Sequence, residues 1–185
     1  MAVHVDTLLP VRPLTIADVD AMVAAGILHE DDRVELLEGV LVEISPQSEA
    51  HAYAVRGLNT LAVLATAGTD LEVLGQAPLL VNSLISRPEP DLAIAPITPR
   101  DRHPSGALLA VEVSVSSRRI DLGLKAKLYA AAGVPEYWVL DVEGRSLICH
   151  RAPGADGYAD IERFGEDATV TARTVALTVP VASLL

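Results

Sequence analysis

Apolar and polar positions along the chain switch between a helical and a strand-like period, and together they predict a layered α/β domain. Thr15 followed by Asp18 resembles a helix N-cap, and apolar residues then recur at helical spacing up to Gly26. A longer helical pattern ends at Gly68, and Glu38-Gly39 lies between two β-rich runs as a hairpin turn. Helices packed on a mixed sheet follow from this order. The predicted segments are a helix over 15–26, a hairpin over 33–44, a long helix over 48–67, strands over 71–74, 78–81, 91–95 and 108–115, a helix from 121 to 133, a hairpin over 137–150, and mostly β structure beyond it.

Length and composition agree with a single folded domain. The 185 residues are half apolar and only 3% aromatic, which argues against a disordered chain. We expect one domain over residues 1–185, with residues 1–13 as an N-terminal extension. Cys149 is the only cysteine, so an intramolecular disulfide and a cysteine zinc site are excluded. No window approaches 18 uninterrupted apolar residues, so we expect no membrane span and a cytoplasmic location.

The net charge of −11 is unevenly distributed, and its distribution changes what the total implies. Non-specific nucleic-acid binding depends on Lys and Arg, so 25 acidic against 14 basic side chains argue against indiscriminate coating of a polyanion. Residues 1–50 hold ten acids and two bases, whereas 116–151 hold four acids and six bases, among them the only two lysines. Arg118, Arg119 and Lys127 in this second window are candidates for a local anion-binding patch, and a solvated helix face is the alternative.

Two carboxylates stand in predicted strands at positions where apolar residues are expected. Asp91 begins a short apolar strand, and Glu112 lies in the middle of a strongly apolar one. Burying a carboxylate there without a partner would cost several kcal/mol, so a compensating cation or a set of hydrogen-bond donors is expected. Mg²⁺ prefers oxygen ligands and usually takes only one or two carboxylates, with water and phosphate oxygens completing the shell. Two such acids followed by a lysine on the next helix indicate a metal-dependent hydrolase.

Common catalytic signatures are absent from the sequence: it has no P-loop, no GxGxxG, no HExxH, no CxxC and no GxSxG. Six other motifs occur in a fixed order, and the block at 133–141 is the most specific of them. They are Arg33-Val-Glu-Leu-Leu-Glu-Gly39, Ser48-Glu-Ala-His51, Pro90-Asp91, Glu112-Val-Ser-Val-Ser116, Asp121 with Lys125 and Tyr129, and Gly133-Val-Pro-Glu-Tyr-Trp-Val-Leu-Asp141. In this combination the chain resembles the Uma2 family of restriction endonuclease-like nucleases, in the PD-(D/E)XK superfamily, from about residue 14 onward.

The resemblance implies a restriction endonuclease-like core, with a central mixed β-sheet flanked by helices and additional hairpins. It also implies an Mg²⁺-dependent endonuclease, with Mn²⁺ as an alternative ion, in which Asp91 and Glu112 bind the metal. Glu112-Val113-Ser114 matches the (D/E)XK tripeptide except for serine in the third position. The family supplies the lysine from the following helix instead, where Lys125 matches. Glu35 resembles an additional catalytic acid, and His51 resembles the histidine that opens the long helix.

One position departs from the family pattern, and the roles of Asp121 and Lys127 leave alternatives open. Val115 stands where family members carry proline, and we expect this difference to change the loop shape rather than the chemistry. Asp121 lies four residues before Lys125 and either pairs with it or caps the helix. Lys127 competes with Lys125 for the catalytic role. At 100° per residue Lys125 flanks the apolar stripe of Leu124 and Leu128, whereas Lys127 lies 200° away, so Lys125 is preferred.

Each candidate residue also has a structural interpretation. Asp91 could cap a turn, Glu112 could form a salt bridge, Glu35 could lie on the hairpin surface, and His51 could serve the helix start alone. The implied partner is nucleic acid, with DNA expected, held locally and weakly. The rival function is a catalytically silent binding or scaffold domain of the same fold, including as a homodimer. A third option is a metal-dependent hydrolase of a smaller phosphoester.

Overall fold

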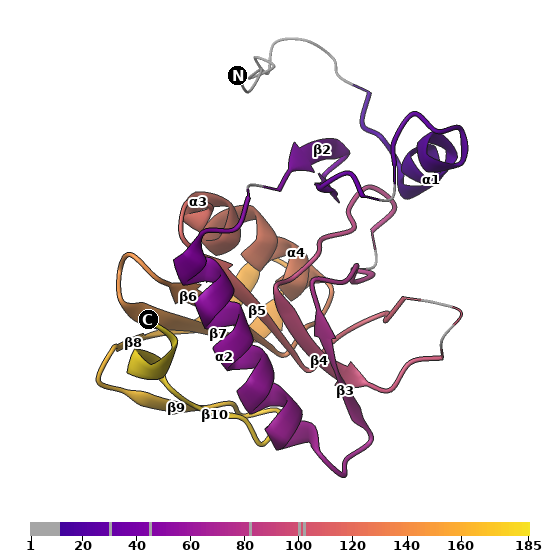
Figure 1. The fold of residues 1–185 in the computed structure, drawn as a ribbon. Coiled ribbons are helices and arrows are strands. Elements are labelled where there is room, and N and C mark those ends of the chain that lie inside the picture. Colours follow the sequence, from indigo (N-terminus) through magenta and orange to yellow (C-terminus); the bar gives the residue numbers. More distant parts are fainter. Residues whose placement is uncertain (1–11, 30, 45, 82, 100, 102) are drawn as a thin grey trace.

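A computed structural model describes residues 12–29, 31–44, 46–81, 83–99, 101 and 103–185, and Figure 1 shows its fold. The predicted extension over 1–13 lies outside the described residues except for Arg12 and Pro13. The helices are α1 (Ile16–Ala24), α2 (Glu49–Thr66), α3 (Arg118–Ile120), a π-helical turn (Asp121–Lys125), α4 (Ala126–Ala131) and a 3₁₀ turn (Val181–Leu184). The strands are β1 (Val34–Leu37), β2 (Val40–Glu43), β3 (Leu71–Gly75), β4 (Leu92–Pro96), β5 (Leu109–Ser114), β6 (Glu136–Asp141), β7 (Ser146–Gly154), β8 (Gly157–Gly165), β9 (Thr169–Thr171) and β10 (Thr178–Pro180).

A mixed sheet of six strands, in the order β3-β4-β5-β6-β7-β8, forms the centre of the fold. Its β5 and β6 are parallel, and every other neighbouring pair is antiparallel. A parallel pair requires a crossover connection, which the α3–α4 segment provides between β5 and β6. This arrangement confirms the predicted central mixed sheet flanked by helices.

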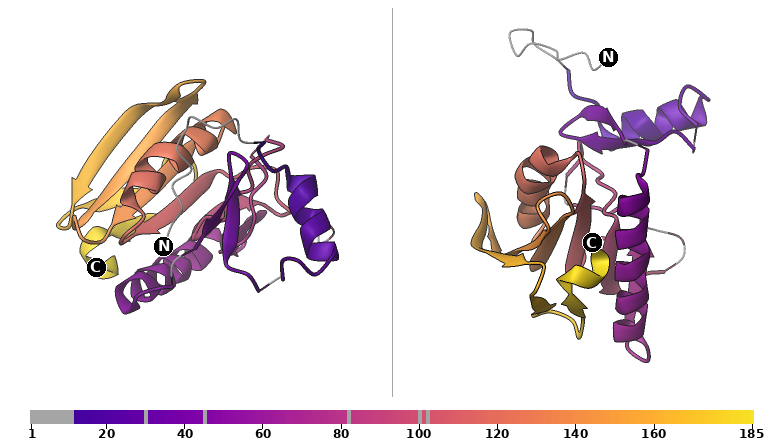
Figure 2. Two further views of the ribbon diagram at one scale, coloured as in Figure 1. Left: turned by 90° about the horizontal axis from the view of Figure 1, so that it is seen from above. Right: turned by 60° about the vertical axis from the view of Figure 1, so that its left-hand side comes forward.

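Helices cover both faces of this sheet (Figure 2). On one face α2 and the C-terminal turn pack on the side chains of Leu92, Val111 and Trp138. On the other face α4 packs on the alternate positions, including Ala110 and Val139. Successive side chains of a strand point to opposite faces, so Glu112 shares the α4 face with Ala110. A carboxylate therefore enters an otherwise apolar layer beneath α4.

The β1–β2 hairpin lies with α1 over one end of the sheet (Figure 1). Its turn is the predicted Glu38-Gly39 pair, and both residues have positive φ, +49° and +79°, as a type I′ turn requires. The hairpin is held against a distant segment, since the Gly39 N–H donates to the Ile85 carbonyl at 2.7 Å and Leu36 bridges to Arg87. This docking directs Glu35 of β1 toward the sheet end.

Two sequence predictions differ from the structure. Residues 78–81 form no strand: the Leu79 N–H donates to the Pro88 carbonyl at 3.0 Å, so this segment bonds to a loop while its apolar side chains join the core. Asp121 does not cap a helix, because helical structure already begins at Arg118. None of the helices in the described part of the chain is both long and apolar enough to cross a bilayer.

Candidate active site

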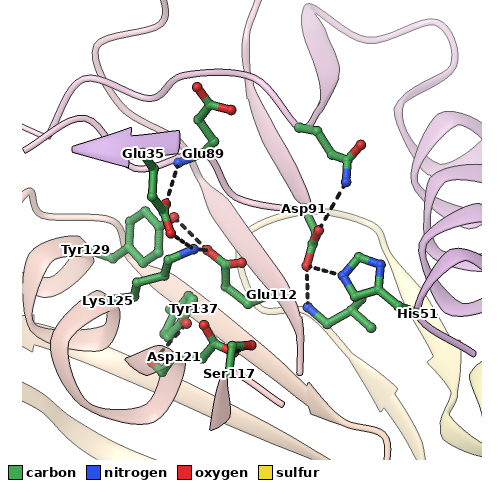
Figure 3. Close-up of polar contacts among 12 residues, drawn as sticks. Glu35, His51, Glu89, Asp91, Glu112, Ser117, Asp121, Lys125, Tyr129 and Tyr137 are labelled. Carbon is green, nitrogen blue, oxygen red and sulfur yellow. Dashed lines mark hydrogen bonds and ion pairs between the residues drawn. The ribbon is translucent and has the colours of Figure 1, made fainter. Parts of the chain in front are cut away.

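A cavity of about 250 Å³ lies where β1, α2, β5 and the α3–α4 segment meet, and most of the predicted site residues line it. It is called the acidic cavity below. Glu35, Glu112 and Lys125 point toward one another in Figure 3, and Asp91 and His51 lie on the other side of Glu112. Its charged lining consists, among the described residues, of Glu35, Glu43, Glu89, Asp91, Glu112, Asp121, Arg33 and Lys125. Six carboxylates thus face two permanently cationic side chains, which leaves the cavity with a negative charge.

Lys125 lies between two buried carboxylates. Its Nζ is 3.0 Å from Glu35 Oε1 and 3.0 Å from Glu112 Oε1, and all three side chains are at most 7% exposed. Burial alone would lower the pKa of Lys125, but the Glu112 and Glu35 carboxylates outweigh it and raise that pKa above its ordinary value. Lys125 is therefore a fixed ammonium ion at neutral pH. The exposure of Lys127 agrees with the choice of Lys125 from helical geometry.

Glu112 is the most strongly perturbed acid of the cavity. Its Oε1 accepts hydrogen bonds from Lys125 Nζ and from the Tyr129 hydroxyl, both at 3.0 Å. Burial raises the pKa of Glu112 well above its ordinary value; Lys125 opposes this shift, whereas the Asp91, Asp121 and Glu35 carboxylates reinforce it. A second cation near Glu112 would relieve this electrostatic cost.

Asp91 is held by donors from two other elements. Its Oδ2 accepts hydrogen bonds from the Val113 N–H at 2.8 Å and from His51 Nε2 at 3.1 Å, and Gln76 Nε2 lies 3.4 Å from Oδ1. His51 is set in the first turn of α2, whose N-cap Ser48 accepts its backbone N–H. The His51 Nδ1 is buried and has no hydrogen-bond partner among the described residues. His51 thus orients the Asp91 carboxylate through its other ring nitrogen.

Asp121 belongs to the cavity floor but does not pair with Lys125. Its Oδ2 accepts a 2.5 Å hydrogen bond from the Ser117 hydroxyl, and its carbonyl accepts one from the Tyr137 hydroxyl at 3.0 Å. Burial raises the pKa of Asp121. The π-helical turn from Asp121 to Lys125 places these two residues on the buried side of the segment. Such turns are rare and occur often at functional sites.

Sequence reasoning did not assign a role to Glu89 in the cavity or to Tyr129 beside it. Glu89 is partly buried beside Glu35, whose Oε2 accepts the Glu89 N–H at 3.3 Å, and burial followed by the Glu35 charge raises the pKa of Glu89. The only sequence signal was its place just before Pro90-Asp91. Tyr129 was noted as part of a motif, but its contact with Glu112 depends on how α4 packs on β5 and has no local signature.

The three predicted nucleic-acid contacts lie outside the cavity lining. Arg118, Arg119 and Lys127 are all exposed. Arg118 directly follows the cavity residue Ser117, and its Nε donates to Asp141 Oδ2 at 2.8 Å. Of the three residues of the predicted patch, Arg118 is thus next to a cavity residue in the chain.

The donor set determines which metal the cavity suits. No group of three or more His, Cys, Asp or Glu side chains in the described ranges is arranged as a metal cluster. Zinc sites of the structural type need such a cluster, whereas Mg²⁺ takes one or two carboxylates and completes its shell with water and phosphate. Asp91 and Glu112 line the same cavity, whose described lining contains six carboxylates against two permanent cations. These residues fit Mg²⁺ or Mn²⁺ and do not fit structural zinc.

The fold is that of a restriction endonuclease-like α/β protein. The Uma2 family model, described as "Putative restriction endonuclease", matches residues 18–182. The chain belongs to the Uma2 family, and this membership supports a nuclease. The crystal structure titled "a putative nuclease belonging to DUF820", from Anabaena variabilis ATCC 29413, is similar in fold, with a TM-score of 0.75 and 13% identity over 93% of this chain and 97% of that chain. No curated protein sequence matches the chain significantly.

Proposed function

We propose that the protein is a divalent-metal-dependent endonuclease that hydrolyses phosphodiester bonds in DNA. The observation that supports this most strongly is the buried Lys125 ammonium between Glu35 and Glu112, in a cavity that also contains Asp91. This cavity brings together more carboxylates than its cations can balance, and a divalent metal ion would offset the excess negative charge.

In this proposal Asp91 and Glu112 hold Mg²⁺, or Mn²⁺ in its place. The bound ion supplies a Lewis acid that polarises the scissile phosphate. Val113 N–H and His51 keep the Asp91 carboxylate in place, and Tyr129 does the same for Glu112. Fixed carboxylates cost little reorganisation when charge develops on the phosphate.

Lys125 provides the positive charge nearest the reacting phosphate. Its ammonium group stabilises the negative charge that accumulates on the phosphoryl oxygens as water attacks phosphorus and the bond to the leaving oxygen breaks. Glu35 holds the ammonium from the hairpin side and keeps it charged, since its carboxylate raises the Lys125 pKa. The hairpin thereby contributes to the site although it lies outside the central sheet.

Cleavage of supercoiled plasmid tests the proposal. Wild-type protein is incubated with Mg²⁺ or Mn²⁺ and compared with Asp91→Asn and Glu112→Gln, which preserve side-chain shape and remove one charge each. Asp156→Asn serves as the matched control, because Asp156 is exposed and lies outside the cavity lining. We expect the two cavity variants to lose cleavage by about 100-fold or more, and the control to cleave as the wild type does. Undiminished cleavage by Glu112→Gln would refute the assignment.

Two observations favour a second candidate, a catalytically silent scaffold domain. Lys125 already neutralises part of the charge at Glu112, and the described residues contain no metal cluster of three side chains. Calorimetric titration with Mn²⁺ separates the two functions. The nuclease requires saturable binding that Asp91→Ala abolishes, whereas binding unaffected by that substitution, or none at millimolar Mn²⁺, favours the scaffold.

A further inference from the structure

Next to the acidic cavity, two arginines from distant parts of the chain converge on one buried carboxylate. Arg118 Nε donates to Asp141 Oδ2 at 2.8 Å, and Arg163 Nη2 lies 3.5 Å from the same oxygen. Asp141 is only 4% exposed, whereas the two arginine side chains are 53% and 52% exposed. Arg118, Asp141 and Arg163, called the arginine cluster below, carry a net charge of +1 on a chain that is acidic overall.

Hydrogen bonds within and around the arginine cluster fix both guanidinium groups, and some of their terminal nitrogens have no partner among the described residues. Arg118 uses only Nε in its bond to Asp141, so both terminal nitrogens have no partner among the described residues. Arg163 is fixed through Nε to the Ser146 hydroxyl at 3.0 Å and through Nη2 to the Gly144 carbonyl at 3.4 Å, which leaves Nη1 unpaired within the same set. Terminal guanidinium nitrogens held outward in this way match the geometry of a phosphate.

The arginine cluster lies on the same face of the sheet as the catalytic candidates. Strand register places Glu112 opposite Val139, Val139 opposite Ile148, and Ile148 opposite Arg163, so these four residues form one row across the sheet. Arg118 directly follows Ser117, which lies beside Asp121 at the cavity floor (Figure 3). The two middle residues of that row are buried beneath α4, so it is Arg118, next to the cavity-lining Ser117, that places the arginine cluster beside a nucleic-acid strand whose phosphate enters the cavity.

The turn between β6 and β7 is closely packed against the cluster. Asp141 Oδ1 accepts the Gly144 N–H at 2.8 Å. A Cβ added at Gly144 would come within 2.3 Å of Asp141 Oδ2 and 2.8 Å of Arg163 Nη2. Any larger residue must displace the carboxylate that orients both arginines. This offers a way to disturb the cluster without changing charge.

We propose that Arg118 and Arg163, oriented by Asp141, form a phosphate-binding subsite for the nucleic-acid backbone adjoining the acidic cavity. The inference rests on the proposed function for its ligand class and adds Arg163 and Asp141 to the site. Arg118 and Arg163 contact the backbone phosphate, and Asp141 is a positioning residue.

Binding of a short fluorescein-labelled DNA duplex, followed by anisotropy with a chelator present, tests the subsite apart from cleavage. Arg118→Ala and Arg163→Ala are compared with Arg173→Ala. Arg173 is also exposed and pairs with Asp160, and its backbone N–H donates to Glu136, at the opposite end of β6 from Asp141. Between roughly 50 and 200 mM salt, each cluster variant should lower the slope of log K against log salt by about 0.9, the value for one lost phosphate contact. The Arg173 control should keep the wild-type slope. Equal effects of all three substitutions, or no measurable wild-type binding at the lowest salt, would overturn the subsite.

A charge-neutral pair of variants tests the positioning role. Gly144→Ala should lower the salt slope as the arginine variants do, whereas Gly106→Ala, where an added Cβ meets nothing within 4 Å, should not. Thermal unfolding of both variants checks that the fold is retained. A Gly144→Ala protein that is folded and binds as the wild type does would refute the role of Asp141. If DNA binding depends on the arginine cluster but no Mg²⁺- or Mn²⁺-dependent cleavage occurs, the subsite stands and the nuclease is refuted. If cleavage occurs but binding does not depend on the arginine cluster, the nuclease stands and the subsite is refuted.

Discussion

Replacing Lys125 by methionine should destabilise the fold strongly, because it leaves two buried carboxylates without their shared cation. The Nζ is 3.0 Å from both Glu35 Oε1 and Glu112 Oε1, and these side chains are 7% and 5% exposed. Removing one partner of a buried ion pair costs about 3–5 kcal/mol, while methionine approximately fills the volume of the lysine stem. We therefore expect a loss of about 3–5 kcal/mol in the free energy of unfolding at neutral pH.

Urea unfolding measures this loss. With a urea m value of about 2 kcal/mol/M, a destabilisation of about 3 kcal/mol lowers the midpoint by about 1.5 M. Lys127→Met is the control and should change the free energy by at most about 0.5 kcal/mol, since Lys127 is exposed. Adding Glu35→Gln to Lys125→Met should recover part of the loss, because it removes one of the two uncompensated charges. Equal midpoints for the two lysine variants would refute the account of the ion pairs.

Three further predictions concern the fold. Cys149 is buried and its thiol pKa is raised to about 12, so a thiol reagent such as DTNB should label it only after unfolding; rapid labelling of native protein would contradict its burial. Burial lowers the pKa of His150 in the folded protein, so as the pH falls the unfolded state is protonated first. The free energy of unfolding should therefore decrease below pH 6.5, by at most about 1.4 kcal/mol per pH unit. In urea titrations His150→Phe should remove this pH dependence, and a profile unchanged by the substitution would refute it. Gly39→Ala should lower stability by about 1–3 kcal/mol, because φ is +79° and the new Cβ would lie 2.3 Å from Pro13 Cβ; an unchanged thermal midpoint would contradict the hairpin geometry.

Features of the fold that depend on neighbouring residues could be predicted from the sequence. The β1–β2 hairpin turns at the predicted Glu38-Gly39, because positive φ at two successive residues restricts the choice of side chains. The position of Glu112 in an apolar strand predicts a compensating partner, because a buried carboxylate without one is costly. Its compensation by Lys125 agrees with that expectation.

The features that the sequence did not predict correctly depend on contacts between segments that are distant in the chain. Residues 78–81 carry an apolar run that is typical of a strand, but their backbone bonds to loops, and no periodicity records that choice. Asp121 resembles an N-cap, yet the helical segment begins at Arg118 and contains a π-helical turn. Arg163 joins Arg118 only through the register of four strands, which the order of the elements alone does not fix.

The central claim is that Asp91 and Glu112 together hold a divalent cation in the acidic cavity. Anomalous diffraction from a crystal grown with Mn²⁺ tests it most directly. The account predicts an anomalous peak between the two carboxylates in wild-type protein and its loss in Glu112→Gln crystals grown in the same way. A fully occupied Mn²⁺ elsewhere on the protein with none at Asp91 and Glu112, or a peak at this place that persists in Glu112→Gln, would contradict it.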